Sequence, residues 1–424
     1  MAESGDPLRI AYLEAVDGLT VARQAPPPRA GSFSATYVAP AGWAFDEPGA
    51  EGTARLAAHL AAVAAGPFDR VELARRLDRL GATLTSQCAP ESAELTVWGP
   101  ADAWATLLGL LAEAVARPRF APEDVARARR QLLERQLQEA TQPASRADRE
   151  FLRAVFPERH PYRGTGVGSR RSLGRLSRAR LLRFHRRQFL ARGGVVVLTT
   201  AARGPAVVRE ARRRFGTMPK GAEPTLPSTA RAAGPAARRT IDLPGRSQVE
   251  VRIGGAGLAR ADPRYPAAYL ANEVLGGRPL LSRLFQRVRE RGGLAYRAHS
   301  DLEAMRWGGY WVASAGTGAD RWRKVVPMLS EELARLREEE VPARELRLVR
   351  ESAIGEIPLS LEVTSDAHEL AVDAAYHRLA EDHWRRWPHL LRALRPRDLR
   401  EVAAAAFGPA GPVTVVAGPL DPRR

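Results

Sequence analysis

The hydrophobic and polar positions of this chain follow the same order of elements in both halves. Alternating apolar positions predict strands at residues 32–38 and 93–98 in the first half, and at 248–253 and 307–313 in the second. Each half continues with amphipathic helices and ends in a short run of mostly β-branched residues, which is typical of a buried strand. Strands grouped with strands and helices with helices predict an α+β fold, in which each half is a largely antiparallel sheet packed with helices.

The elements recur along the chain at nearly one offset. The helix that opens at residues 101–104 (ADAW) has a counterpart 218 residues later, at residues 319–322 (ADRW). The arginine-rich helix after Pro122 has a counterpart after Pro342, and the closing runs VVVL and VTVV are again 218 residues apart. A repeat of about half the chain length predicts two homologous halves.

A segment rich in Pro, Gly, Ala, Ser and Thr lies between the two halves. Such a composition is typical of a linker. We therefore expect an N-terminal domain at residues 1–215, a linker at residues 216–237 and a C-terminal domain at residues 238–424.

The composition excludes several classes of protein. With 424 residues, 45% hydrophobic and 27% charged, the chain is neither disordered nor collagen-like. One cysteine, Cys88, excludes a disulfide framework and a metal site built from cysteines, and we expect it to be an inert packing residue. The N-terminal residues lack the pattern of a secretory signal and no apolar run approaches about 18 residues, so we expect a cytoplasmic protein without a membrane span.

The net charge of +17 invites a nucleic-acid interpretation, which the distribution of charge weakens. Lysine occurs only at Lys220 and Lys324, and the arginines are spread over the whole chain among 48 acidic residues. We expect an arginine-studded, solvated surface that suits acidic peptides, and no dedicated nucleic-acid partner.

Candidate chemistry in the first half centres on a predicted helix that follows Gly52-Thr53. Arg55 and His59 lie four residues apart and therefore on one face of that helix. Two histidines at this spacing, with a glutamate between them, would hold Zn²⁺ and take a proton from its bound water.

The whole chain resembles the M16 metallopeptidases, the inverted-motif zinc proteases related to pitrilysin and the mitochondrial processing peptidase. In that family this helix carries HxxEH, whereas here the string Gly-Thr-Ala-Arg-Leu-Ala-Ala-His places Arg55 and Ala58 at the first histidine and the glutamate. Only His59 is retained, and the position of the third ligand falls on Arg135, with Glu134 beside it. The resemblance therefore implies no metal and no general base in this chain, and we expect His59 to be a buried or partly buried helix residue.

The resemblance extends to the second half, where one functional motif of the family is intact. Arg289 and Tyr296 match an arginine–tyrosine pair that in the family reaches into the zinc site opposite, and the glycine-rich turn at Gly276 and Gly277 implies substrate binding. A phenol can donate to a developing oxyanion, and a guanidinium can hold a substrate carbonyl. On the residues alone, Arg289 could instead pair with a carboxylate while Tyr296 packs in a strand.

Some M16 enzymes have two chains, of which one carries HxxEH and the other carries the arginine–tyrosine pair. The resemblance thus implies LuxS/MPP-like halves and a non-catalytic subunit of a heterodimeric M16B zinc endopeptidase, inactive alone, which supplies half of a peptide-binding chamber. Zinc is then expected in an HxxEH-bearing partner subunit. The alternative is a catalytically silent scaffold or core subunit of an M16-like assembly.

Two further motifs are set aside. His368-Glu369 begins an HExxH pattern, but Val372 stands where the second histidine belongs, so we expect a surface helix there. Residues 164–168 (GTGVG) look like a phosphate loop but lack the Lys-Ser/Thr that would follow.

Overall fold

The first sheet is built by six strands from the N-terminal half of the chain. In this computed structural model, which describes residues 6–16, 18–27, 31–226, 236–407 and 411–420, their order is β1-β2-β6-β3-β5-β4. All neighbouring strands pair antiparallel except β2 and β6, which are parallel. The strands are β1 (Ile10–Val16), β2 (Leu19–Gln24), β3 (Ser32–Ala39), β4 (Thr83–Cys88), β5 (Ala93–Pro100) and β6 (Val195–Thr199).

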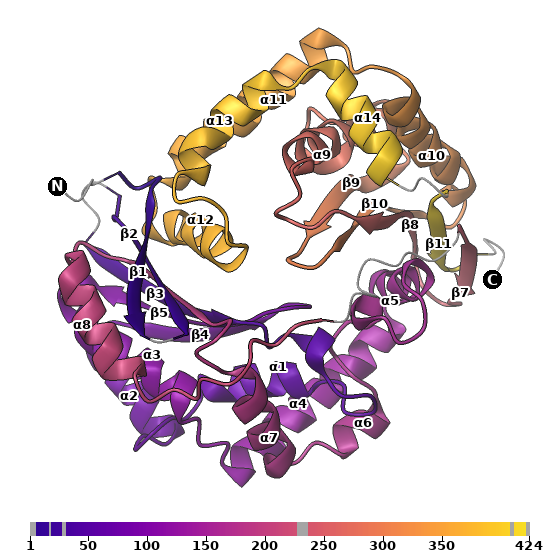
Figure 1. The fold of residues 1–424 in the computed structure, drawn as a ribbon. Coiled ribbons are helices and arrows are strands. Elements are labelled where there is room, and N and C mark those ends of the chain that lie inside the picture. The colour runs from indigo at the N-terminus through magenta and orange to yellow at the C-terminus, as the bar shows by residue number, and fades with distance from the viewer. Residues whose placement is uncertain (1–5, 17, 28–30, 227–235, 408–410, 421–424) are drawn as a thin grey trace. The chain divides into compact units, whose positions relative to one another are not determined.

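The closing strand β6 is apolar up to its last residue, Thr199, because both faces of this sheet are covered. Val196 and Leu198 belong to the larger hydrophobic core on one side, whereas Val195 and Val197 belong to a smaller core on the other. Helices from the N-terminal half cover the first side, and α12 (Thr364–Tyr376) covers the second (Figure 1). The covering and flanking helices are α1 (Thr53–Ala61), α2 (Arg70–Arg79), α3 (Trp104–Ala116), α4 (Pro122–Thr141), α6 (Arg170–Gly174), α7 (Arg178–Gln188) and α8 (Gly204–Phe215), with the short turns η1 (Trp43–Phe45) and η2 (Ala101–Ala103).

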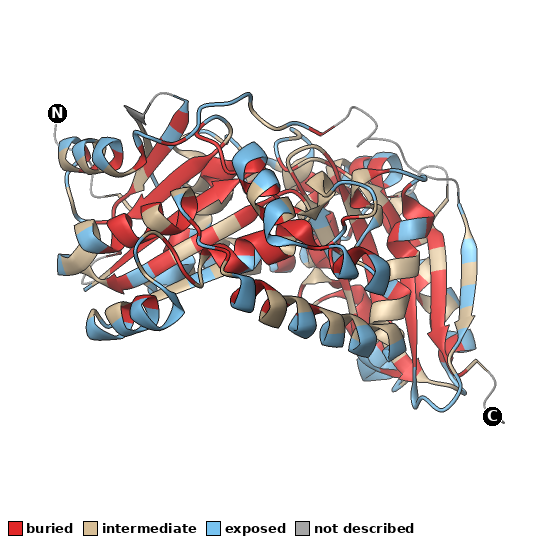
Figure 2. Cartoon of the chain, turned by 90° about the horizontal axis from the view of Figure 1, so that it is seen from below, coloured by how far each residue is buried: buried red, intermediate tan, exposed pale blue. Residues whose placement is uncertain are grey.

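The second sheet has five strands, in the order β7-β11-β8-β10-β9, and only β7 and β11 are parallel. Its strands are β7 (Arg238–Asp242), β8 (Gln248–Gly257), β9 (Ala295–Ala304), β10 (Gly309–Gly318) and β11 (Val413–Gly418). The elements that pack on its strands are α5 (Pro143–Val155), α9 (Tyr265–Asn272), the π-type turns η5 (Glu273–Gly277) and η6 (Phe285–Arg291), and α10 (Trp322–Glu338). The remaining elements are η3 (Pro161–Arg163), α11 (Ala343–Ser360), α13 (His383–Ala393) and α14 (Pro396–Ala406). Figure 2 shows most strand residues as buried, with exposed residues gathered on helices and loops.

Each sheet borrows one helix from the other half of the chain. The chain separates into two compact units, and residues 137–164, which include α5, belong to the second unit. Residues 356–386, which include α12, belong to the first. In the second unit α5 packs on β8 and β11.

The predicted fold class is confirmed: two mixed units, each with a largely antiparallel sheet and packed helices. The strand expected at 307–313 begins at Gly309 and continues to Gly318, because β10 pairs with β8 and β9 along that whole length. The domain boundaries on either side of the linker at residues 216–237 stay a prediction. Residues 227–235 of this linker lie outside the described residues. No described helix is both long and apolar enough to span a membrane.

Candidate functional site

The helix that carries the altered zinc motif begins at a glycine which the backbone requires. Gly52 precedes α1 with φ +99°, a left-handed conformation that other residues adopt rarely, and a Cβ there would lie 2.8 Å from Leu173 Cδ2. Two backbone N–H groups at the start of α1, those of Gly52 and Ala54, donate to the Asp46 carboxylate at 2.8 Å each. Burial raises the pKa of Asp46 to about 7.

Arg55 uses its guanidinium to tie α1 to the neighbouring loop. Its Cζ lies 5.0 Å from the centre of the Trp43 ring, and its nitrogens donate to the carbonyl oxygens of Thr165 at 3.3 Å and Gly166 at 3.4 Å. Gly166 has φ +70°, and a Cβ there would lie 2.5 Å from the Trp43 ring. The glycine-rich segment that resembles a phosphate loop therefore serves here as the acceptor for Arg55.

The other positions of the motif do not form a zinc site either. Ala58 is buried at 1% exposure in the core beneath α1. His59 keeps an exposed surface beside the buried face of α1, which is made by alanines and leucines. Burial nevertheless lowers the pKa of its ring below the ordinary value, so the expectation of a partly buried histidine is not contradicted. Glu134 and Arg135 are exposed on α4.

We tested these residues against the requirements of Zn²⁺. A structural or catalytic zinc needs at least three nitrogen, sulfur or oxygen ligands from the protein, and a guanidinium beside the only histidine repels the cation. In the part of the chain that the structure describes, no three His, Cys, Asp or Glu residues lie together as such a site. The residues present do not fit zinc. That this chain binds no metal stays a prediction, which a measurement of its metal content can test.

The arginine–tyrosine pair, by contrast, is brought together in the second unit. The Cζ atom of Arg289, on η6, lies 4.9 Å from the ring centres of both Phe285 and Tyr296. Tyr296 lies on β9, at the edge of the sheet, and is 77% exposed. Among the described residues, neither the Arg289 guanidinium nor the Tyr296 hydroxyl has an ion-pair or hydrogen-bond partner. Arg289 therefore stacks on aromatic rings and does not pair with a described carboxylate, which was the alternative expectation. Tyr296 is exposed to solvent.

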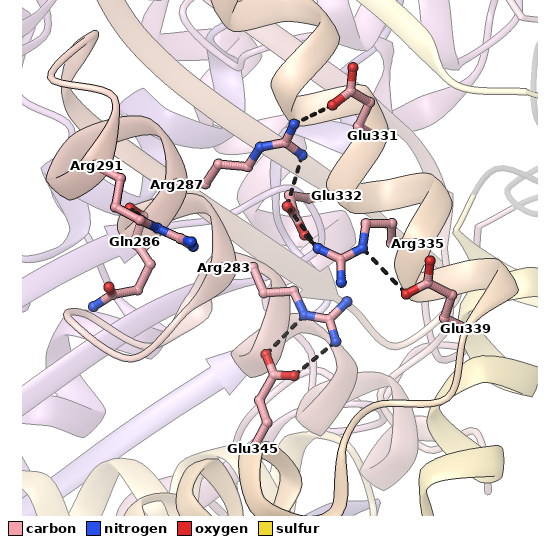
Figure 3. A network of polar contacts seen from close by, with 9 residues as sticks. All are labelled: Arg283, Gln286, Arg287, Arg291, Glu331, Glu332, Arg335, Glu339 and Glu345. Atoms are coloured by element: carbon pink, nitrogen blue, oxygen red, sulfur yellow. Dashed lines mark hydrogen bonds and ion pairs between the residues drawn. The ribbon is translucent and has the colours of Figure 1, made fainter.

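A network of ion pairs fixes the element that carries Arg289 (Figure 3). Arg287, on η6, pairs with Glu332 of α10 at 2.8 Å and also with Glu331. Arg283, just before η6, makes two 2.9 Å hydrogen bonds with Glu345 of α11. Because the side chain of Glu332 is only 3% exposed, its pair with Arg287 is shielded from water and holds η6 against α10.

The two glycines assigned to substrate binding are accounted for by close packing. A Cβ on Gly276 would overlap with Ser300 N of β9, and a Cβ on Gly277 would overlap with the Glu273 carboxylate. Glu273 in turn pairs with Arg278 at 2.7 Å, and both side chains are buried. Binding of substrate at Gly276 and Gly277 stays a prediction.

Sequence reasoning missed a buried histidine. His368 was expected on a surface helix, but α12 buries it at 3% exposure against the first sheet. Its Nδ1 lies 2.8 Å from Thr199 Oγ1 and its Nε2 lies 2.8 Å from Thr36 Oγ1. Since Thr199 already donates to Gln24 Oε1 at 2.9 Å, the neutral ring fits with Nδ1–H donating and Nε2 accepting.

A signal for this burial was present in the sequence. Ala371 and Ala375 follow His368 at helical spacing, so all three lie on one face with the buried alanines of α12. Burial lowers the pKa of His368 to about 3, and the ring stays neutral at ordinary pH.

Comparison with known proteins gives matches over most of the chain. A family model described as insulinase (peptidase family M16) matches residues 20–162, and one described as peptidase M16 inactive domain matches residues 175–352. An uncharacterized zinc protease of Mycobacterium tuberculosis is 26% identical over 362 residues, which are 84% of this chain and 80% of the relative. Another from Bacillus subtilis is 35% identical over 118 residues, 28% of this chain and 29% of the relative.

Solved structures share the fold along nearly the full length. The crystal structure of a peptidase M16 inactive domain from Pseudomonas fluorescens has a TM-score of 0.89 and 22% identity, and the match covers 97% of this chain and 98% of that one. A protease from Helicobacter pylori has a TM-score of 0.87 and 17% identity, and the match covers 97% and 99% of the two chains.

Proposed function

Because the chain belongs to the M16 peptidase family, we propose that it is the non-catalytic subunit of a heterodimeric zinc endopeptidase of the M16B type. It contributes Arg289 and Tyr296 to the active site of a catalytic chain that carries HxxEH. The catalytic chain supplies the zinc and the general base, and the substrate is a peptide or an unfolded segment.

One contrast between the two halves carries this proposal. The positions of the first zinc ligand and of the general base are occupied by a guanidinium tied to carbonyl groups and by a buried alanine. The arginine–tyrosine pair instead keeps an exposed phenol and a guanidinium without a carboxylate partner among the described residues. Exposed groups without partners suit a reaction in trans, because they remain free to bind a substrate held by another chain.

The chemistry of the pair suits peptide-bond cleavage. The Tyr296 hydroxyl can donate a hydrogen bond to the oxyanion of the tetrahedral intermediate, where negative charge develops. The planar guanidinium of Arg289 can donate to a backbone carbonyl of the substrate and so orient the scissile bond. The contacts of Arg289 with two aromatic rings limit its rotamers, which lowers the entropy lost on binding.

Reconstitution with an HxxEH-bearing M16 chain tests the proposal. Neither chain alone should cleave a fluorogenic peptide at an appreciable rate, and a 1:1 complex should. A catalytic chain that is fully active alone, and that does not associate with this one, would overturn the proposal.

Arg289→Ala in the complex separates the proposed role from a scaffold role. Its kcat/KM should fall, with Arg289→Lys restoring only part of it, because an ammonium lacks the planar fork of a guanidinium. Arg291→Ala, a matched change at an exposed position of the same element, should leave kcat/KM near wild type. A silent scaffold predicts damaged assembly with unchanged activity per complex.

A further inference from the structure

One long segment of the chain contains many arginines and no acidic residue. Residues 159–209 include 13 arginines and neither aspartate nor glutamate. The segment supplies α6 and α7, and its exposed arginines on and beside these helices are Arg170, Arg171, Arg175, Arg178, Arg183, Arg186 and Arg187. Elsewhere the chain mixes both signs, so this surface concentrates the positive charge.

The arginines of α7 form an ordered stripe. Leu181, Phe184, His185 and Gln188 make the buried face of α7. The outward stripe, which we define as Ala179, Leu182, Arg183, Arg186 and Arg187, follows the spacing of one helical face and lines a surface hollow of about 660 Å³. The stripe thus presents guanidinium groups around a small apolar floor.

This arrangement is unfavourable for the isolated helix. Arg183 and Arg187 are like charges at i,i+4, and Arg178 and Arg180 stand in the first turn, where the helix dipole favours acidic residues. Arg183 and Arg186 form no salt bridge with any described carboxylate. An anionic partner would remove this repulsion, so the surface is better matched to a complex than to the free chain.

One carboxylate of the chain itself forms an ion pair with this surface. Glu47 pairs with Arg187 at 2.7 Å at the edge of the stripe. The hydrogen bond from Arg187, with the charges of Arg183 and Arg180, holds the pKa of Glu47 below its ordinary value. The stripe therefore already binds a carboxylate at one end.

We propose that the outward stripe of α7 docks an acidic segment of a partner protein. Carboxylates of that segment pair with the arginines of the stripe, and an apolar side chain covers Leu182. A polypeptide fits better than a nucleic acid, because the apolar floor has no counterpart in a phosphodiester backbone. The stripe also contains no aromatic residue on which a base could stack.

The test uses the full chain and a short fluorescent peptide that repeats Glu-Glu-Leu, with binding followed by fluorescence anisotropy. Arg183→Gln/Arg186→Gln should weaken binding about tenfold or more. Arg75→Gln/Arg79→Gln on α2 is the matched control: both arginines are exposed and form no salt bridge with a described carboxylate. The control loses the same two charges and should change the affinity less than about twofold.

Two further probes complete the test. A Glu-Glu-Ser repeat should bind the wild-type chain more weakly than Glu-Glu-Leu, because serine cannot cover Leu182. Single-stranded DNA of equal charge should also bind more weakly at the same salt concentration. Equal losses in both double variants would show a response to net charge alone, and tighter binding of DNA would show a nucleic-acid surface; either result overturns the proposal.

Discussion

Arg55 shows how a single residue changes the contacts of the altered zinc motif. Arg55 fills the position of a ligand and gives its hydrogen bonds to the carbonyls of Thr165 and Gly166. The substitution therefore does more than remove a metal ligand, since it also builds a contact between α1 and the adjacent loop.

Replacing Arg55 tests that contact. Arg55→Ala removes two hydrogen bonds and the stacking on Trp43, so the free energy of unfolding should fall by about 1–2 kcal/mol. Urea denaturation measures the change. Arg171→Ala, at an exposed position of α6, is the control and should stay within about 0.5 kcal/mol of wild type. An equal effect of the two variants would show that Arg55 contributes nothing specific.

The buried His368 predicts a pH dependence of stability. Its folded pKa of about 3 lies below the ordinary value of 6.5, so between these values the unfolded chain binds a proton that the folded chain does not. Acidification from pH 6.5 towards 3 should therefore destabilise wild type relative to His368→Gln, by about 1.4 kcal/mol per pH unit. Measuring the free energy of unfolding of both chains across this window isolates the histidine, because other groups titrate equally in both.

The control for this measurement is His389→Gln, at an exposed position of α13. Its stability curve should run parallel to that of wild type. Parallel curves for His368→Gln as well would mean that His368 is protonated in the folded state and would contradict its burial.

For the candidate residues, the sequence says little about the surroundings that each side chain meets in the fold. The resemblance to the M16 family singled out Arg289 and Tyr296, and their role stays a prediction. The stacking of Arg289 on Phe285 depends on the π-type turn, which no residue pattern indicates. His368 was assigned the wrong exposure, because its burial depends on Thr36 and Thr199, which lie far from it along the chain.

At the scale of elements, strands were predictable where one or both faces are buried. The apolar run of β6 and the alternating pattern of β3 arise from burial, whichever element covers the strand. Both strands can therefore be recognised from their own residues. The helix α12 is different. Its face of alanines would fit either sheet, and the choice of the first sheet depends on contacts made more than 150 residues away along the chain.

The ion-pair network around η6 predicts a difference between two neighbouring glutamates (Figure 3). Both pair with Arg287, but the side chain of Glu332 is 3% exposed and that of Glu331 is 56% exposed. Glu332→Gln should lower the free energy of unfolding by about 1–2 kcal/mol, because it removes the charge of a buried carboxylate that pairs with both Arg287 and Arg335. Glu331→Gln should cost less than about 1 kcal/mol, since water screens that pair.

Urea denaturation of both variants checks this prediction, with Glu331→Gln as the matched control. Equal losses would show that burial of the pair has no influence on its strength. If the ranking is as expected, η6 is held in place chiefly by Glu332, and so is the position of Arg289 on it.

At the scale of the whole molecule, the proposed chemistry is divided between two chains. The chain described here lacks a ligand set that fits zinc among its described residues. The isolated, purified chain should therefore contain far less than one zinc per molecule, and EDTA should leave its Tm unchanged, because no folding energy is linked to a metal. Elemental analysis with one tightly bound zinc per chain would contradict this view.

The proposed role of this chain is to contribute a hydrogen-bond donor to the active site of another chain. One substitution tests this role most directly. Tyr296→Phe keeps the ring that stacks on Arg289 and removes only the hydroxyl. In a purified complex with the HxxEH-bearing chain, kcat should fall by roughly 10²–10³, while zinc content and complex formation stay unchanged. A Tyr296→Phe complex with the kcat of wild type would contradict the claim and leave the chain as a scaffold.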